Sequence, residues 1–263
     1  VIEGRANGEL VFTIAIDQGT GQVTVNQFRP LDHDDITDHD ESGVAERFHV
    51  GRIGVQLTVT DGDGDTASSD VVELGSLIRF EDDGPAIALT GATATARLDE
   101  SVGADPADPN ADDETNLAAT PDAIGFATLS GAAFFTVNAG SDGEASRAYE
   151  LTLSADGADS GLDDTKTGNS VFLFLIGGQI VGKEGTDATD AETNGATVFT
   201  IDVDAATGEV SVNQFRAIEH DDPTDHDESD AGEPETIAAN VIGVQLTVTD
   251  GDGDTATASV DIG

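Results

Sequence analysis

Two short runs of aspartate and glycine are the residues of this sequence best placed to do chemistry. Each run reads DGDGD, so three carboxylates alternate with glycines in a segment that favours a tight turn. Ca²⁺ is a hard cation that takes about six to eight oxygen ligands, and such a turn can bring several carboxylates together. We therefore predict a calcium site at each run. The predicted ligands are Asp61, Asp63, Asp65, Asp250, Asp252 and Asp254.

A second interpretation of these runs is a solvated hairpin turn, in which aspartate and glycine simply suit the backbone geometry. Three like charges held together without a cation would make such a turn costly, which favours the calcium interpretation. The spacing resembles the first half of an EF-hand loop. Neither run is an EF-hand, because the twelfth position holds Val72 in the first copy and Asp261 in the second.

Acidic residues also cluster at two other places, in the linker FEDDGP (80–85) and in LDES (98–101). An ion shared between the linker and a neighbouring turn would lock two modules end to end, whereas a plain solvated linker is the alternative. For the LDES segment the two interpretations are nearly balanced. The candidate ligands are Glu81, Asp82, Asp83, Asp99 and Glu100.

The densest acidic segments are HDDITDHDE (33–41) and its copy HDDPTDHDE (220–228). Three interpretations remain open: a calcium loop, a solvated acidic loop, and a transition-metal site that uses His33 and His39. Histidine with carboxylates suits zinc, but thiolates are missing and calcium does not favour imidazole. The candidate calcium ligands are Asp34, Asp35, Asp38, Asp40, Asp221, Asp222, Asp225 and Asp227.

The charge balance limits the partners of the chain. Asp and Glu number 53 against 10 Lys and Arg, a net charge of -43, so nucleic acid and anionic membranes are repelled and cations attracted. Cysteine is absent, and no apolar run approaches the roughly 18 residues of a membrane span, so we expect neither disulfides nor membrane insertion. With so many carboxylates, two close together are no evidence for acid–base catalysis, and no GxxxxGK[ST] or HExxH motif occurs. We expect a protein that is not an enzyme.

An internal repeat sets the organisation of the chain. Residues 11–42 match residues 198–229 at 22 of 32 positions, and IGVQLTVTDGDGDTA at 53–67 recurs unchanged at 242–256. A repeat of this length corresponds to one or two whole domains.

Alternating β-branched residues in VFTIAID, QVTVNQF and GVQLTVT predict strands, and TGQ between two of them predicts a hairpin. The predicted fold is all-β, with tandem β-sandwich modules at 1–85, 86–168 and 169–263. The first module is expected to lack its first strand, and the middle module to be of a second type.

The repeat, the DGDGDT hairpins and the FEDDGP linker together resemble the tandem extender repeats of type I secreted RTX adhesins, giant surface proteins of Gram-negative bacteria. The likeness is most specific in VIGVQLTVTDGDGDTATASVDIG and NQFRAIEHDDPTDHDE. It implies immunoglobulin-like sandwiches whose acidic linkers bind calcium and stiffen, so that the modules project a distal binding domain from the cell surface. The nonapeptide repeats GGxGxDxUx of the family are missing, which indicates the extender region rather than the secretion-signal end.

We therefore expect an extracellular, calcium-dependent spacer that is a monomeric fragment of a longer protein, with calcium ions and neighbouring modules as its partners. One alternative is a ligand-binding adhesin module for sugar or peptide, although aromatic residues make up only 5% of the chain. A further alternative is an accessory domain of a secreted calcium-dependent hydrolase.

Overall fold

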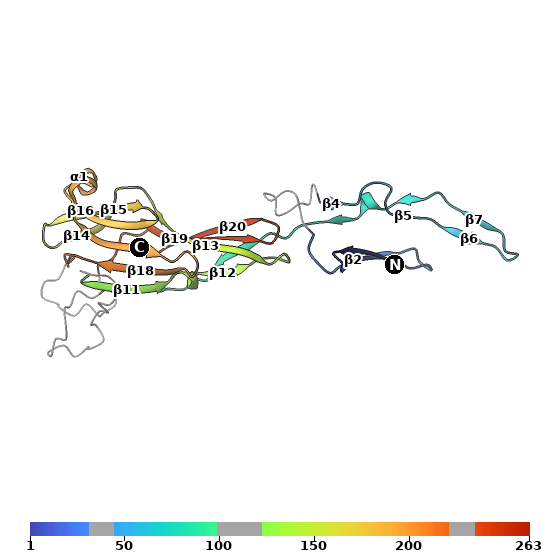
Figure 1. Cartoon of the computed structure of the whole chain (residues 1–263), viewed down its shortest axis with the longest axis horizontal. Coiled ribbons are helices and arrows are strands. Elements are labelled where there is room, and N and C mark those ends of the chain that lie inside the picture. Colours follow the sequence, from blue (N-terminus) through green and yellow to red (C-terminus); the bar gives the residue numbers. More distant parts are fainter. Residues whose placement is uncertain (32–44, 99–122, 221–234) are drawn as a thin grey trace, which may run out of the picture. The chain divides into compact units, whose positions relative to one another are not determined.

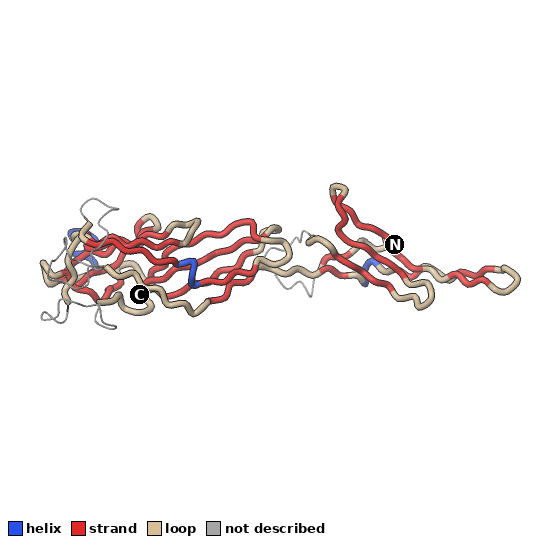
Figure 2. The backbone as a smooth tube through the Cα atoms, turned by 90° about the horizontal axis from the view of Figure 1, so that it is seen from below, coloured by secondary structure: helices blue, strands red, loops and turns tan. Residues whose placement is uncertain are grey.

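The computed structural model describes residues 1–31, 45–98, 123–220 and 235–263. The all-β prediction is confirmed, because 51% of the described residues lie in strands and the helices among them are few and short (Figure 2). Within the described ranges, the α-helix α1 spans Ala188–Asn194, and single-turn 3₁₀ helices span Gly75–Leu77 and Gly131–Phe134. Among the described residues, no helix combines the length and the apolar character that crossing a membrane requires.

The chain divides into two compact units, which we call unit 1 and unit 2. Unit 1 contains residues 1–86, 138–146 and 249–256, and unit 2 contains residues 87–137, 147–248 and 257–263. The predicted boundary at 168 falls between strands β14 (Ala158–Asp164) and β15 (Asn169–Ile176), which pair with each other. Strands of the predicted second and third modules therefore share one sheet.

Unit 1 is built from short antiparallel pairs. Strands β1, β2 and β3 form a three-stranded sheet in that order, and β4–β9, β5–β8 and β6–β7 form separate pairs (Figure 1). Asn7 and Gly8, with φ of 52° and 87°, make the two-residue turn between β1 and β2, which needs positive φ at both positions. The strands are β1 (Ile2–Ala6), β2 (Glu9–Ile16), β3 (Val23–Gln27), β4 (Glu46–Arg47), β5 (Gly54–Val55), β6 (Thr58–Thr60), β7 (Thr66–Ser68), β8 (Val72–Glu73) and β9 (Arg79–Phe80).

The apolar centre of unit 1 is small and aromatic. The rings of Phe12, Phe48 and Phe80 lie within 5.2 to 5.7 Å of one another, in edge and tilted arrangements that suit the ring quadrupole. Val11 and Ile14, which lie close to Phe12 in the sequence of β2, are also buried. The core of unit 1 is therefore confined to the surroundings of these three rings, and the residues of β6 and β7 are exposed.

Unit 2 carries a larger arrangement of strands. Its six-stranded sheet has the order β11-β18-β17-β16-β15-β14, and a three-stranded sheet has the order β13-β19-β20. The residues that alternate inward on both sheets, such as Leu173, Val198, Leu246 and Val248, belong to one buried cluster. The strands that lie wholly or mostly in unit 2 are β10 (Ala86–Leu89), β11 (Gly125–Ser130), β12 (Phe135–Asn138), β13 (Glu144–Leu153), β14, β15, β16 (Gln179–Gly185), β17 (Thr197–Val203), β18 (Glu209–Gln214), β19 (Ile242–Asp250) and β20 (Thr255–Asp261).

A buried ion pair joins the end of β14 to the segment that follows β18. Both carboxylate oxygens of Asp164 accept from the Arg216 guanidinium, at 2.8 and 2.6 Å, and Thr167 donates from its hydroxyl at 2.7 Å. Asp164 is fully buried. Burial disfavours its ionised form, but the hydrogen bonds from Arg216 and Thr167 outweigh this and hold the pKa of Asp164 below its ordinary value.

We expect Arg216→Ala to lower the free energy of unfolding of unit 2 by about 3 kcal/mol at neutral pH, because it leaves a buried carboxylate without its partner. A carboxyl with a lowered pKa in the fold contributes stability above its unfolded pKa of about 4, and that contribution is lost as pH falls through the folded pKa. The loss caused by Arg216→Ala should therefore shrink below about pH 4. Urea unfolding at several pH values measures this.

The matched control is Arg29→Ala. Arg29 occupies the equivalent position of the repeat, but its partner is the exposed Glu9. This variant should change stability little at any pH. Equal losses in the two variants would contradict the assigned role of the buried pair.

Candidate metal centre

The second DGDGD run forms the turn between β19 and β20. The Asp250 N–H donates to the Asp254 carbonyl at 3.0 Å, which closes the turn, and Gly253 adopts a φ of 112°. The N–H groups of Gly253 and Asp254 donate to Asp250 Oδ1 at 3.2 and 2.8 Å. One oxygen of Asp250 therefore holds the turn, and the other oxygen, Oδ2, is left for another role.

The three aspartates of this turn lie together. One carboxylate oxygen from each of Asp250, Asp252 and Asp254 lies within 4.8 Å of the others. Asp250 and Asp254 are each only 1% exposed. Asp250 Oδ2 and both carboxylate oxygens of Asp252 are buried and accept no hydrogen bond. Buried polar atoms of this kind are rare in folded proteins and point to an ion or water that completes them.

A second group brings in two more chain segments. Carboxylate oxygens of Asp82, Asp142 and Asp252 also lie within 4.8 Å of one another, so Asp252 belongs to both groups. Asp82 lies in the FEDDGP linker, and Asp142 lies in the turn between β12 and β13. All five aspartates belong to unit 1. We call them the Asp cluster: Asp82, Asp142, Asp250, Asp252 and Asp254.

Two glycines allow the three segments to approach. A Cβ on Gly140 would lie 2.2 Å from the carbonyl oxygen of Asp83, and a Cβ on Gly251 would lie 2.6 Å from that of Asp142. Ser141 strengthens the first approach, because its N–H donates to Asp83 Oδ1 at 3.0 Å. Glycine is therefore required where these backbones meet.

The charge of the Asp cluster is poorly solvated. Burial raises the pKa of Asp250, and the neighbouring Asp252 carboxylate raises it further, against the lowering effect of the turn's N–H groups. Asp142, Gly251 and Asp252 also line a hollow of about 490 Å³, together with Pro30 and Leu31. The site thus combines carboxylates that repel one another with a space beside them.

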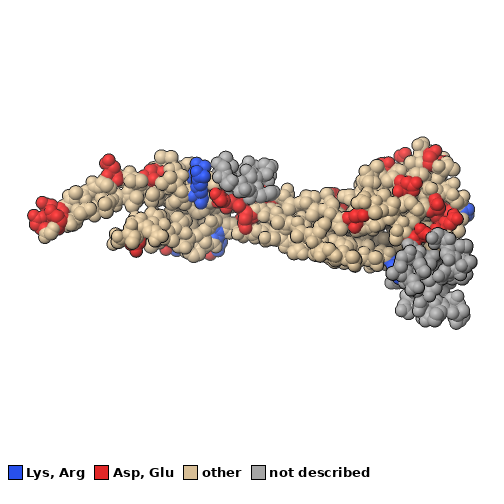
Figure 3. Space-filling view, turned by 180° about the vertical axis from the view of Figure 1, so that it is seen from behind, with Lys and Arg blue, Asp and Glu red and all other residues tan. Residues whose placement is uncertain are grey.

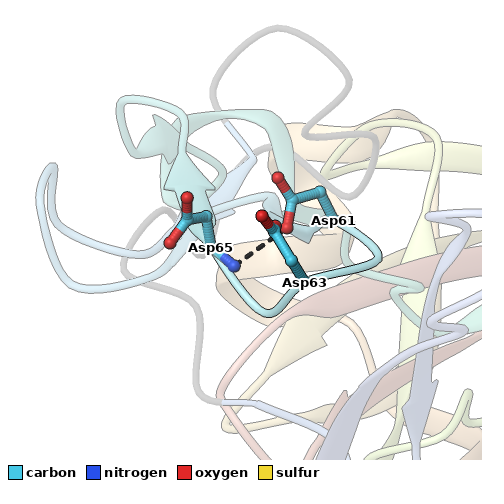
Figure 4. A group of neighbouring side chains, drawn as sticks. All are labelled: Asp61, Asp63 and Asp65. Atoms are coloured by element: carbon cyan, nitrogen blue, oxygen red, sulfur yellow. Dashed lines mark hydrogen bonds between the residues drawn. The ribbon is translucent and has the colours of Figure 1, made fainter.

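The first DGDGD run forms the turn between β6 and β7 and has a different environment. The carboxylates of Asp61, Asp63 and Asp65 lie within 4.8 Å of one another but are exposed, and acidic side chains gather at this tip of unit 1 (Figure 3). The Asp65 N–H donates to Asp61 Oδ1 at 2.9 Å (Figure 4). The pKa of Asp61 is lowered, through its hydrogen bond with the Asp63 side chain and then through the N–H of Asp65. The same residues are therefore solvated in one copy and buried in the other.

The other predicted ligands are placed as follows. Asp82 lies in the Asp cluster, whereas Asp83 is exposed and accepts from Ser141, and Glu81 is exposed. Sequence reasoning missed Asp142, because nothing in the segment SDGE shows that its turn meets two others. The remaining predicted ligands lie outside the described residues: Asp34, Asp35, Asp38, Asp40, Asp99, Glu100, Asp221, Asp222, Asp225 and Asp227, with His33 and His39.

The donor set of the Asp cluster fits a hard cation. Its side-chain donors are all carboxylate oxygens, which suit Ca²⁺ or Mg²⁺ and not a thiophilic metal. Mg²⁺ requires a near-ideal octahedron and retains several waters, whereas Ca²⁺ accepts about six to eight oxygens in flexible geometry. Two groups of three carboxylates that share Asp252 therefore offer the kind of donors that a hard divalent cation takes.

Comparison with known proteins identifies one family. A family model described as "Domain of unknown function (DUF5801)" matches residues 1–75 and 95–263. No curated protein and no solved structure matches the chain. Because the family model covers most of the sequence, including both copies of the repeat, the chain belongs to the DUF5801 family.

Proposed function

We propose that the Asp cluster binds Ca²⁺, and that bound calcium stiffens this chain as a structural spacer in a secreted bacterial surface adhesin. The observation that carries the proposal is the set of buried carboxylate oxygens of Asp250 and Asp252 that accept no hydrogen bond. A cation there would satisfy these oxygens and cancel the repulsion that raises the pKa of Asp250.

The position of the Asp cluster supports a structural role and not a catalytic one. It gathers the linker with Asp82, the β12–β13 turn with Asp142, and the β19–β20 turn with Asp252. An ion shared by these three segments would restrict how the linker moves against the two turns. A module whose linker is tied to these turns by a shared ion would be stiff when calcium is bound and flexible when it is not.

The setting of the proposal follows from the sequence resemblance to RTX adhesin extender repeats, with immunoglobulin-like sandwiches at the surface of a Gram-negative bacterium. Extracellular calcium modules bind with a Kd of about 10⁻⁴ to 10⁻³ M. A site filled at about 100 times its Kd stabilises the fold by about 2.7 kcal/mol. The chain would therefore be loose where calcium is scarce and rigid outside the cell.

The test is calcium titration by calorimetry, combined with thermal unfolding and small-angle scattering in calcium and in EDTA. We expect saturable binding of calcium. The melting temperature should be several degrees higher with calcium, because a stabilisation of about 2 to 3 kcal/mol implies such a shift for a domain of this size. The molecular dimensions obtained from scattering should have a narrower distribution with calcium than in EDTA. Magnesium at the same concentration serves as the control and should have a smaller effect. A melting temperature and scattering profile unchanged by EDTA would refute the proposal.

A further inference from the structure

Unit 1 repeats one part of unit 2 strand for strand. Gly4 of β1 pairs with Phe12 of β2, and Gly182 of β16 pairs with Phe199 of β17. At both positions an added Cβ would collide with the facing phenylalanine ring. Because Phe12 and Phe199 are equivalent in the repeat, β1-β2-β3 corresponds to β16-β17-β18, and residue 1 corresponds to residue 179.

The equivalent sheet in unit 2 is longer on both sides. There β11 pairs with the outer edge of β18, and β15, followed by β14, extends the sheet beyond β16. In unit 1 the described residues of the sheet end at β1 and β3. Ile2 of β1 is 49% exposed, whereas its counterpart Ile180 is fully buried.

The same contrast occurs within identical sequence. Leu57 and Val59 are 65% and 56% exposed, whereas Leu246 and Val248, their counterparts in the unchanged 15-residue repeat, are fully buried. The strand β19 pairs with β13 on the side away from β20, whereas β6 pairs, within the described part of the chain, with β7 alone. The segment 53–67 in unit 1 thus has the residue types of a buried strand, but the strand that would cover it is missing among the described residues.

The polar contacts agree with the apolar ones. Arg216 reaches the buried Asp164 on β14, whereas the equivalent Arg29 pairs with the exposed Glu9. Every partner that unit 1 lacks in these comparisons comes from one continuous stretch of the chain, most of which belongs to unit 2. That stretch is residues 123–178, which hold β11 to β15, and we call it the complementing segment.

We propose that unit 1 is a docking surface for a further copy of the complementing segment, as another repeat of this family would supply. The added strands would continue the sheet beyond β1 and β3, pair with the free edge of β6, and cover Leu57 and Val59. The open edge of β1 and the exposed strand β6 would otherwise be sites for unspecific strand pairing. This proposal concerns strand pairing and does not depend on calcium binding.

The test uses the full chain with a copy of residues 123–178 joined directly before Val1, since Gly178 precedes the residue equivalent to Val1. Residue-resolved hydrogen exchange is measured at 57–60 and at 246–249. In the unextended chain of residues 1–263 we expect fast exchange at 57–60 and slow exchange at 246–249. In the extended chain, exchange at 57–60 should slow by about 100-fold or more and approach that of the second copy.

The control is the same extended chain with Leu151→Asp and Val171→Asp in the added copy only, since both residues are buried in unit 2. This variant should exchange at 57–60 as fast as the unextended chain, while 246–249 stay slow and report an intact unit 2. Equal protection by the intact and the altered extension would overturn the proposal. So would protection of 57–60 in the unextended chain that grows with protein concentration, because a second copy would then be the occupant.

Discussion

Leu246→Ala is expected to lower the free energy of unfolding of unit 2 by about 3 kcal/mol or more, and Leu57→Ala to leave it almost unchanged. Both leucines lie in the same 15-residue sequence, but Leu246 is fully buried and Leu57 is 65% exposed. Truncating Leu246 removes apolar contacts and leaves a cavity between strands that cannot collapse completely, whereas truncating Leu57 removes a side chain that is mostly in water.

The measurement can be confined to unit 2. Tyr149 is the single tyrosine of a chain without tryptophan, and it is 4% exposed in the core of unit 2. Its fluorescence during urea unfolding therefore reports unit 2 alone. The slope of the transition should stay constant between variants while the midpoint shifts. Because Leu57 belongs to unit 1, the midpoint of Leu57→Ala should equal that of the unsubstituted chain. A midpoint of Leu246→Ala that also equals it would contradict the burial of Leu246.

Asp252→Asn is expected to weaken calcium binding at the Asp cluster by tenfold or more, which is about 1.4 kcal/mol. Asp252 is the residue shared by the two groups of carboxylates, and both its oxygens are buried without a hydrogen bond. The matched control is Asp63→Asn, at the equivalent position of the exposed first run. It should leave the binding measured at the Asp cluster unchanged, which calorimetry on the two variants determines.

Without calcium, Asp252→Asn should stabilise the fold, although the same substitution weakens calcium binding. The substitution removes a charge that raises the pKa of Asp250, so the metal-free variant should be more stable than the natural chain. A carboxyl whose pKa is raised in the fold contributes stability at low pH, and this contribution is lost as pH rises through the folded pKa. The metal-free natural chain should therefore gain stability on acidification from neutral pH toward about 4, and the variant should gain less. Thermal unfolding in EDTA at neutral pH in which Asp252→Asn is no more stable than the unsubstituted chain would contradict the assigned repulsion between Asp250 and Asp252.

Much of the fold could be predicted from residue patterns alone. The alternation in VFTIAID and GVQLTVT predicted the strands β2 and β19, because a half-buried strand places every second side chain on one face. Asp and Gly in the DGDGD runs predicted the turns, because the N–H groups of a tight turn need a nearby acceptor and one position needs positive φ. Asp250, Asp252 and Asp254 were also predicted to lie together, since their spacing in a turn requires it.

Tertiary structure decided the rest. Asp142 joins Asp82 and Asp252 only because three turns distant in sequence meet, and a local pattern carries no information about such a meeting. The identical segments at 53–67 and 242–256 show the same limit most directly. Both form a strand, a turn and a strand, but Leu246 and Asp250 are buried while Leu57 and Asp61 are exposed. Burial and pKa depend on which strands pack alongside, so the same residues are core and candidate metal ligands in one copy and solvated surface in the other.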